Sequence, residues 1–239
     1  MSEFTGFRPA AMDFFRRLKR RNTKDWFEAN RDLYQDAVRR PLQVLVEEVD
    51  VRLARVAPEI LGDPRRSIFR IHRDIRFSRD KSPYKTHAAC WFYHRDAGRG
   101  VGSEAEGGAG FYFHLSPEGS FLGGGLWHPP RNSLTRIREA LAEAPARFAR
   151  IVKAPAFRRR FGALDDEDVL KRLPRGFEPG HTAEAWLRYQ SFTAGRELTA
   201  REALSPRLPD LLARDYAALL PLVRWLNQAI GFRPGTRRL

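Results

Sequence analysis

Helical periodicity dominates the first sixty residues of the chain. Apolar side chains recur every three to four positions in residues 26–38, directly after Asn22 or Thr23, whose side chains can cap a helix. A second apolar stripe follows Pro41, a residue suited to the first turn of a helix. Stripes of this kind are typical of a buried helix face, and they predict a helical region over residues 8–58.

The hydrophobic period changes to two in the middle of the chain. In residues 69–77 apolar and polar positions alternate, as they do on a strand with one buried face. Three further runs, at 86–94, 110–115 and 120–128, are rich in aromatic residues that favour β-structure. Together the four segments predict an antiparallel meander of about four strands within residues 67–128.

Helical spacing returns at residue 132 and continues to residue 231. A Gly-rich stretch, roughly residues 97–110, joins the second and third expected strands and is long enough to form a mobile loop. No internal repeat and no long polar linker divides the chain. We therefore expect a single domain over residues 1–239, of the α+β class, in which N-terminal and C-terminal helices flank a central antiparallel sheet.

Composition restricts the class of protein further. Of the 239 residues 42% are hydrophobic, which is enough for a core, and the single cysteine, Cys90, excludes a disulfide framework and a cysteine-rich zinc site. The sequence has no apolar signal segment at its start and no run of about 18 apolar residues that could cross a bilayer. These features predict a soluble, cytoplasmic protein with no membrane partner, and they leave the oligomeric state open.

The charge of the chain is strongly positive and unevenly placed. It carries 43 Lys and Arg against 29 Asp and Glu, a formal net charge of +14. Residues 65–99 alone hold ten basic and three acidic side chains, which is half of that excess. Such a concentration favours an anionic partner, with nucleic acid or a nucleotide as the first choice.

The most unusual residues lie at the centre of this basic segment. On a regular strand Arg70, Asp74 and Arg76 would share the polar face, whereas Arg73 would lie among the apolar side chains. A cation in that position needs a carboxylate, carbonyl groups or a bound anion, because burying it without a partner is costly. The loop over residues 78–85 adds lysines, an arginine and hydroxyl groups, which are the donors that phosphates and carboxylates bind.

We choose the candidate ligand-binding residues for their positive charge, for an aromatic ring that could stack on a ligand, or for their position in an expected loop. Tyr84 and Trp127 offer aromatic rings, and Arg175 precedes a glycine in an expected loop, from which we expect it to join the basic face. The full set is Arg70, Arg73, Arg76, Lys81, Tyr84, Lys85, Trp127 and Arg175. The six histidines lack the spacing of a metal site and no phosphate-loop or dinucleotide fingerprint occurs, so we predict no metal and no cofactor.

The block of residues 73–87, RDIRFSRDKSPYKTH, resembles the signature of a widespread uncharacterised family, domain of unknown function 2461. Other stretches match this family in order, among them residues 22–27, GLWHP at 125–129 and LPRGF at 173–177. The resemblance spans nearly the whole chain. It implies a single domain but no catalytic residue, because the family has no established activity.

Three functions are compatible with these residues. The first is binding of a phosphate-bearing or otherwise anionic ligand, nucleic acid or a nucleotide, through the basic strand-loop-strand. The second is an enzyme acting on a phosphorylated or carboxylate substrate, with Asp74 or His87 as acid or base and Asp80 as a further catalytic candidate. The third is an ion-pair network that fixes the fold, while a protein partner carries the function.

Overall fold

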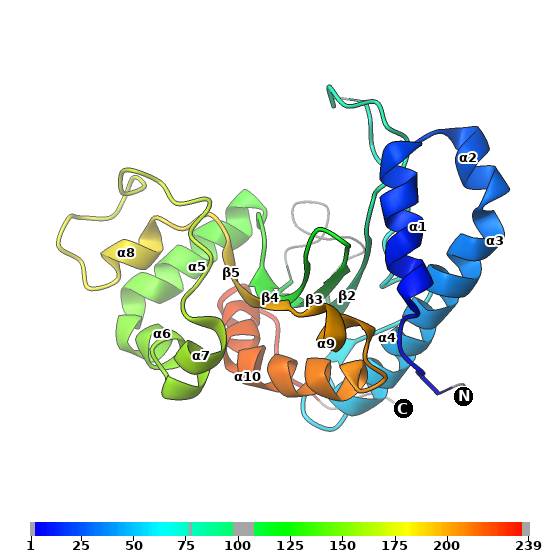
Figure 1. The fold of residues 1–239 in the computed structure, drawn as a ribbon. Helices are drawn as coiled ribbons and strands as arrows, with labels where there is room; N and C mark the ends of the chain where they lie inside the picture. Colours follow the sequence, from blue (N-terminus) through cyan, green and yellow to red (C-terminus); the bar gives the residue numbers. More distant parts are fainter. Residues whose placement is uncertain (1–2, 77, 98–107, 236–239) are drawn as a thin grey trace.

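The computed structural model describes residues 3–76, 78–97 and 108–235, which form an antiparallel sheet and a set of helices around it (Figure 1). The helical elements are α1 Pro9–Arg20, α2 Lys24–Ala29, α3 Arg31–Tyr34, the π-helical turn η1 Gln35–Arg39, α4 Arg40–Leu53, α5 Arg131–Glu143, α6 Pro145–Val152, α7 Pro155–Phe161, α8 Glu184–Leu187, α9 Ala200–Leu204 and α10 Leu208–Ala229. The strands are β1 Ile60–Leu61, β2 Ala88–His94, β3 Gly110–Leu115, β4 Ser120–Leu126 and β5 Phe192–Leu198. The protein is therefore of the α+β class, as the sequence predicts.

Local sequence signals explain how the N-terminal helices begin and turn. The side chain of Thr23 accepts a hydrogen bond from the backbone N–H of Trp26 (3.3 Å), which caps α2. From α3 onward the chain stays helical but widens into η1, where the N–H of Arg40 donates to the carbonyl of Gln35. Pro41 follows directly, and its ring crowds the carbonyl four residues earlier, which accounts for the wide turn at this point.

All strands pair antiparallel with their sequence neighbours, in the order β1-β2-β3-β4-β5. The expected strands at 86–94, 110–115 and 120–128 correspond to β2, β3 and β4. The expected strand over residues 69–77 requires a correction, because residues 69–76 form no strand. This segment holds one isolated bridge, at His72, and a second isolated bridge lies just before it at Ile68. The expected count of about four strands is also too low, because β1 and β5 occupy the two edges of the sheet. Most of the expected Gly-rich loop, residues 98–107, lies outside the described residues.

The strand β5 interrupts the region that we expected to be helical, residues 132–231. Its residue Gly195 lies opposite Gly123 of β4, and a Cβ atom on Gly195 would lie 2.4 Å from the carbonyl oxygen of Leu122. The two strands therefore need glycine to approach each other, and glycine weakens the strand signal in the sequence.

One face of the sheet is covered and the other faces a hollow. On the covered face Tyr216 of α10 is fully buried, stacks on Phe111 at 4.6 Å between ring centroids, and donates its hydroxyl to the Tyr112 carbonyl (3.0 Å). Figure 1 shows α9 and α10 beneath the strands, with α5–α8 on one side and α1–α3 on the other. Because side chains alternate along a strand, those of Tyr112 and His114 point to the opposite face of β3, which we name the open face.

Candidate functional site

The chain bulges where it enters β2. The segment before β2 and the chain that leads into β2 form the two arms of a hairpin, residues 68–76 and 78–90. Two isolated bridges join these arms, one from Ile68 to Cys90 of β2 and one from His72 to Tyr84. Between these bridges three residues on one side face five on the other, so the ladder breaks and residues 85–87 bulge. Bulges re-aim side chains and are frequent beside functional sites, which makes these residues the natural start of a candidate site.

The base of this hairpin is tied to the N-terminal helices through one asparagine. The side-chain amide of Asn22 donates to the carbonyl of Tyr84 (2.9 Å), and its oxygen accepts from the N–H of Tyr84 (3.0 Å). The Tyr84 ring is buried and stacks on Phe27 at 4.2 Å between centroids. The ring that we expected to stack on a ligand is thus a packing contact, and its backbone positions the bulge.

At the tip of the hairpin, Arg73 is paired with other residues of the protein. Its guanidinium pairs with the carboxylate of Asp80 and reaches the hydroxyl of Ser78 (3.5 Å). Hydrogen bonds from Ser82 and from Arg73 hold the pKa of Asp80 well below its ordinary value. The need for a partner that the sequence predicts for Arg73 is therefore met by a carboxylate of the protein.

Two more of the expected ligand-binding cations are also engaged at the tip. Arg76 forms an ion pair with Asp74 (2.6 Å), and Lys81 donates to the backbone carbonyl of Ile75 (3.0 Å). The hydrogen bonds from Arg76 lower the pKa of Asp74 to about 2, so this carboxyl is ionised at neutral pH. At the tip Arg73 and Arg76 are therefore paired with carboxylates, and Lys81 is bound to a backbone carbonyl.

The bulge directs Lys85 and His87 over the open face. The His87 and His114 rings lie 4.3 Å apart, and the hydroxyl of Tyr112 lies 3.2 Å from Nδ1 of His114. The ammonium of Lys85 lies 5.4 Å from the centroid of the Phe69 ring. We name these residues and the exposed neighbour of His114 the open-face cluster: Phe69, Lys85, His87, Tyr112, His114 and Phe121.

Burial sets the protonation states of this cluster. It lowers the pKa of His87 to about 4, with a further contribution from the Lys85 and Arg73 cations. Burial and the neighbouring His87 lower the pKa of His114 to about 4 as well, so both imidazoles are neutral at pH 7. The pKa of Lys85 is also lowered, first by burial and then by Arg70. Among the described residues no carboxylate forms an ion pair with Lys85 or Arg70.

A second polar group lies beyond the other end of β4. Nδ1 of His128 lies 3.4 Å from the carboxylate of Asp168, which also accepts from the side chain of Gln190. The backbone of His128 has a φ of 41°, a conformation that side chains other than glycine rarely adopt, and its N–H donates to the Ser191 hydroxyl (3.0 Å). The adjacent Trp127 is 56% exposed.

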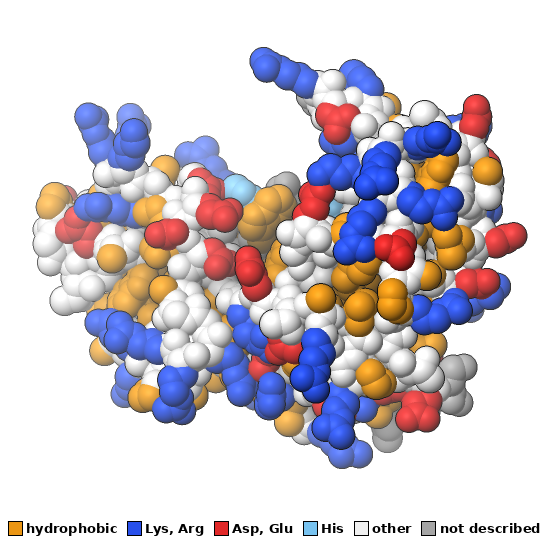
Figure 2. Space-filling view, viewed as in Figure 1, with side chains coloured by type: hydrophobic (Ala, Val, Ile, Leu, Met, Phe, Trp, Pro, Cys, Tyr) orange, Lys and Arg blue, Asp and Glu red, His pale blue; other side chains and the backbone are white. Residues whose placement is uncertain are grey.

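The structure does not bring all the expected ligand-binding residues together. His114 pairs with Phe121 across β3 and β4, so Trp127 lies six residues, about 20 Å, farther along the sheet from the open-face cluster. Arg175 belongs to the segment between α7 and α8, which Figure 1 places on the lobe opposite the hairpin. Figure 2 shows the molecule hollowed between these two lobes, with hydrophobic and histidine side chains in the hollow.

The hydrophobic pattern of β3 indicates two residues of the open-face cluster that the sequence prediction did not include. Tyr112 and His114 alternate with buried phenylalanines in β3, which places both on one face. His87 joins them only because the register aligns Ala89 with His114. Alternation could therefore have found the two β3 residues, whereas their meeting with His87 depends on strand pairing.

Two features are absent from the described residues. They contain no group of three or more His, Cys, Asp or Glu side chains placed to hold a metal ion. None of the helices in residues 3–76, 78–97 and 108–235 has the length and apolar character needed to span a bilayer.

Fold and site together define an α+β protein whose five-stranded antiparallel sheet leaves one face open between two helical lobes. Beside this face lie a histidine pair and Lys85, which forms no ion pair with a carboxylate of the described residues. The family model described as "Conserved hypothetical protein (DUF2461)" matches residues 10–225, nearly the whole chain. The chain belongs to this family, which confirms the resemblance in the sequence. Comparisons with curated proteins and with solved structures give no significant match.

Proposed function

We propose that the protein binds a phosphate-bearing or otherwise anionic ligand, with single-stranded nucleic acid as the first choice, across the open face of the sheet. The observation that carries the proposal is the environment of Lys85. Its ammonium is half-buried beside Phe69 and Arg70, and no carboxylate of the described residues pairs with it. A ligand phosphate would supply the missing negative charge and compensate for the burial.

Aromatic surface supports a nucleic acid over a simple anion. Phe121, 38% exposed, stacks on His114 with 4.7 Å between centroids, and Trp127 is also exposed. Aromatic platforms beside a cationic groove bind the bases and backbone of single strands. The six residues from Phe121 to Trp127 span about 20 Å of backbone along the sheet, which suits an extended chain better than one nucleotide. Arg175, on the opposite lobe, is part of the proposal as a contact for the distal end of such a ligand.

The other two functions have less support from the same residues. An enzyme that uses Asp74 as acid or base has to work with a carboxyl that is paired with Arg76 and has a pKa of about 2. His87, neutral at pH 7, is the better candidate for that role. The ion pair between Arg73 and Asp80 fits a structural role, but it lies at the exposed hairpin tip and not in the core.

The proposal also includes a single domain over residues 1–239 and a location in the cytoplasm. The free, buried thiol of Cys90 supports a reducing compartment.

The test measures affinity for a fluorescent single-stranded oligonucleotide of about 12 residues by anisotropy, between about 50 and 200 mM salt. We expect Lys85→Gln to weaken binding by about tenfold and to reduce the salt slope by about 0.7, the value for one lost phosphate contact on a single strand. Lys24→Gln, which removes an exposed cation at the start of α2, is the matched control and should leave both quantities unchanged.

Two results would overturn the proposal. One is the absence of binding by the unmodified protein at the lowest salt concentration. The other is equal affinity of the Lys85→Gln variant and the unmodified protein, because the contact that carries the proposal would then be unused.

A further inference from the structure

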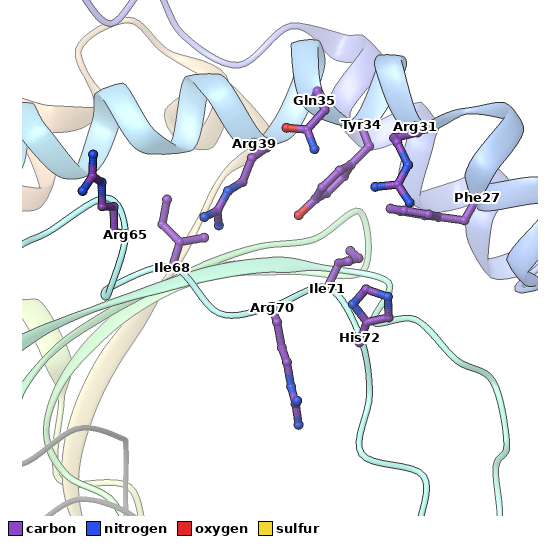
Figure 3. Close-up of a pocket in the computed structure, with 10 residues that line it drawn as sticks. All are labelled: Phe27, Arg31, Tyr34, Gln35, Arg39, Arg65, Ile68, Arg70, Ile71 and His72. Atoms are coloured by element: carbon purple, nitrogen blue, oxygen red, sulfur yellow. The ribbon is translucent and has the colours of Figure 1, made fainter.

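A second concave site lies between the N-terminal helices and the segment before the hairpin. A cavity of about 370 Å³ opens there, bounded by α3, η1 and residues 65–72 (Figure 3). Ten residues line it, and they include four arginines and no carboxylate. A cavity of this size accommodates a small organic molecule, and its lining selects for negative charge.

Two of the four arginines remain available to a ligand in this cavity. Arg31 is committed to Glu28 through two hydrogen bonds (2.6 and 2.8 Å). Arg70 points away from the other side chains in Figure 3, and its charge contributes to the lowered pKa of Lys85. Arg39 and Arg65 form no ion pair with a carboxylate of the described residues, and each extends toward the space between the helix and the segment.

The π-turn places neutral donors beside Arg39. In an α-helix residues five positions apart, such as Tyr34 and Arg39, point about 140° away from each other. The i to i+5 hydrogen bonding of η1 widens the turn and brings such residues to the same side. Figure 3 shows Tyr34, Gln35 and Arg39 extending from the helix toward the segment that carries Ile68. The Tyr34 hydroxyl and the Gln35 amide have no hydrogen-bond partner in the described part of the chain.

We propose that this cavity binds a phosphomonoester. Arg39 and Arg65 hold its phosphate, with the Tyr34 hydroxyl as a further donor, and Ile68 and Ile71 form an apolar floor for its organic part. Two unpaired guanidinium groups balance the two charges of a phosphomonoester, whereas a monocarboxylate would leave one cation uncompensated. The site is separate from the open face and does not depend on the function proposed for it.

The experiment is isothermal titration of the full chain with adenosine 5′-monophosphate, with adenosine and with inorganic phosphate. We expect the monophosphate to bind, phosphate to compete with it, and adenosine to bind at least about tenfold more weakly. Arg39→Gln and Arg65→Gln should each weaken binding of the monophosphate by about tenfold. The matched control is Arg40→Gln, one residue along the helix, where the exposed arginine pairs with Asp36.

A second comparison separates this site from the open face. Lys85→Gln should leave binding of the monophosphate unchanged, and Tyr34→Phe should weaken it by about threefold without changing the thermal midpoint. Equal affinity for adenosine and its monophosphate, or unchanged affinity in both arginine variants, would overturn the inference. Loss of monophosphate binding in Lys85→Gln with retention in Arg39→Gln would assign the phosphate to the open face instead and would equally refute it.

Discussion

The histidine pair of the open-face cluster makes the stability of the fold depend on pH in the mildly acidic range. His87 and His114 are neutral in the folded protein because burial lowers the pKa of each from 6.5 to about 4. In the unfolded chain both regain the ordinary value. Between about pH 6.5 and pH 4 the unfolded state therefore binds more protons than the folded state, and the free energy of unfolding falls as the pH falls.

The size of the effect follows from the two pKa values. At about 1.4 kcal/mol per pH unit, each histidine would contribute about 3 kcal/mol if its ring were fully enclosed. Both rings keep partial contact with solvent, which screens the penalty, and we reduce the figure to about 1 to 2 kcal/mol each. The pair should thus lower the free energy of unfolding by about 3 kcal/mol between pH 7.5 and pH 4.

Urea denaturation over this pH range measures the effect directly. The quantity to compare is the free energy of unfolding of the unmodified protein and of the His87→Gln/His114→Gln double variant at each pH. As the pH falls from 7.5 to 4, we expect the free energy of unfolding of the unmodified protein to fall by about 3 kcal/mol more than that of the variant. His72→Gln, which replaces an exposed histidine, is the control. A difference that stays constant with pH would refute the assignment of neutral, half-buried imidazoles to these positions.

Two further predictions concern polar groups that hold the fold together, and both are measured by urea denaturation at pH 7. Asp215 is fully buried and accepts a hydrogen bond from Nε of Arg196 (2.7 Å), so Asp215→Ala should cost about 3 kcal/mol; a loss below about 1 kcal/mol would contradict this. Asn22→Ala removes both hydrogen bonds to the backbone of Tyr84 and should cost about 2 kcal/mol, whereas Asn132→Ala at an exposed position should cost nothing measurable.

Those parts of the fold that depend on local pattern could be predicted from the sequence. The cap at Thr23 and the strand over residues 110–115 agree with the structure because each is determined by neighbouring residues. The strand β5 could not be predicted, since its Gly195 is required by the approach of a partner strand distant in sequence. The first expected strand shows the same limit: its polar positions, among them Arg70 and Arg76, are exposed as the alternation predicts, but its pairing is interrupted by the bulge.

The sequence indicates which types of residue the candidate site contains, but it does not show which of these residues lie together. The expectation that Arg73 needs a partner follows from burial energetics, and the structure confirms it with Asp80. Which cations stay unpaired depends on tertiary contacts, and the sequence alone cannot distinguish Lys85 from Lys81. The contribution of His114 depends on strand register, which places it against His87.

These contacts reduce the number of cations that remain available to an anionic ligand. At the hairpin tip Arg73 and Arg76 are neutralised by neighbouring carboxylates, so removing either of them weakens a local ion pair and leaves a charge of the opposite sign exposed. Lys85 on the open face, and Arg39 in the cavity beside η1, have no such carboxylate among the described residues. A total of +14 would suggest a diffuse attraction to any polyanion, and every cation would then contribute about equally. The distribution of partners is instead the basis for the two confined anion sites proposed above, at Lys85 on the open face and in the cavity beside η1, each expected to be sensitive to the loss of one or two particular cations.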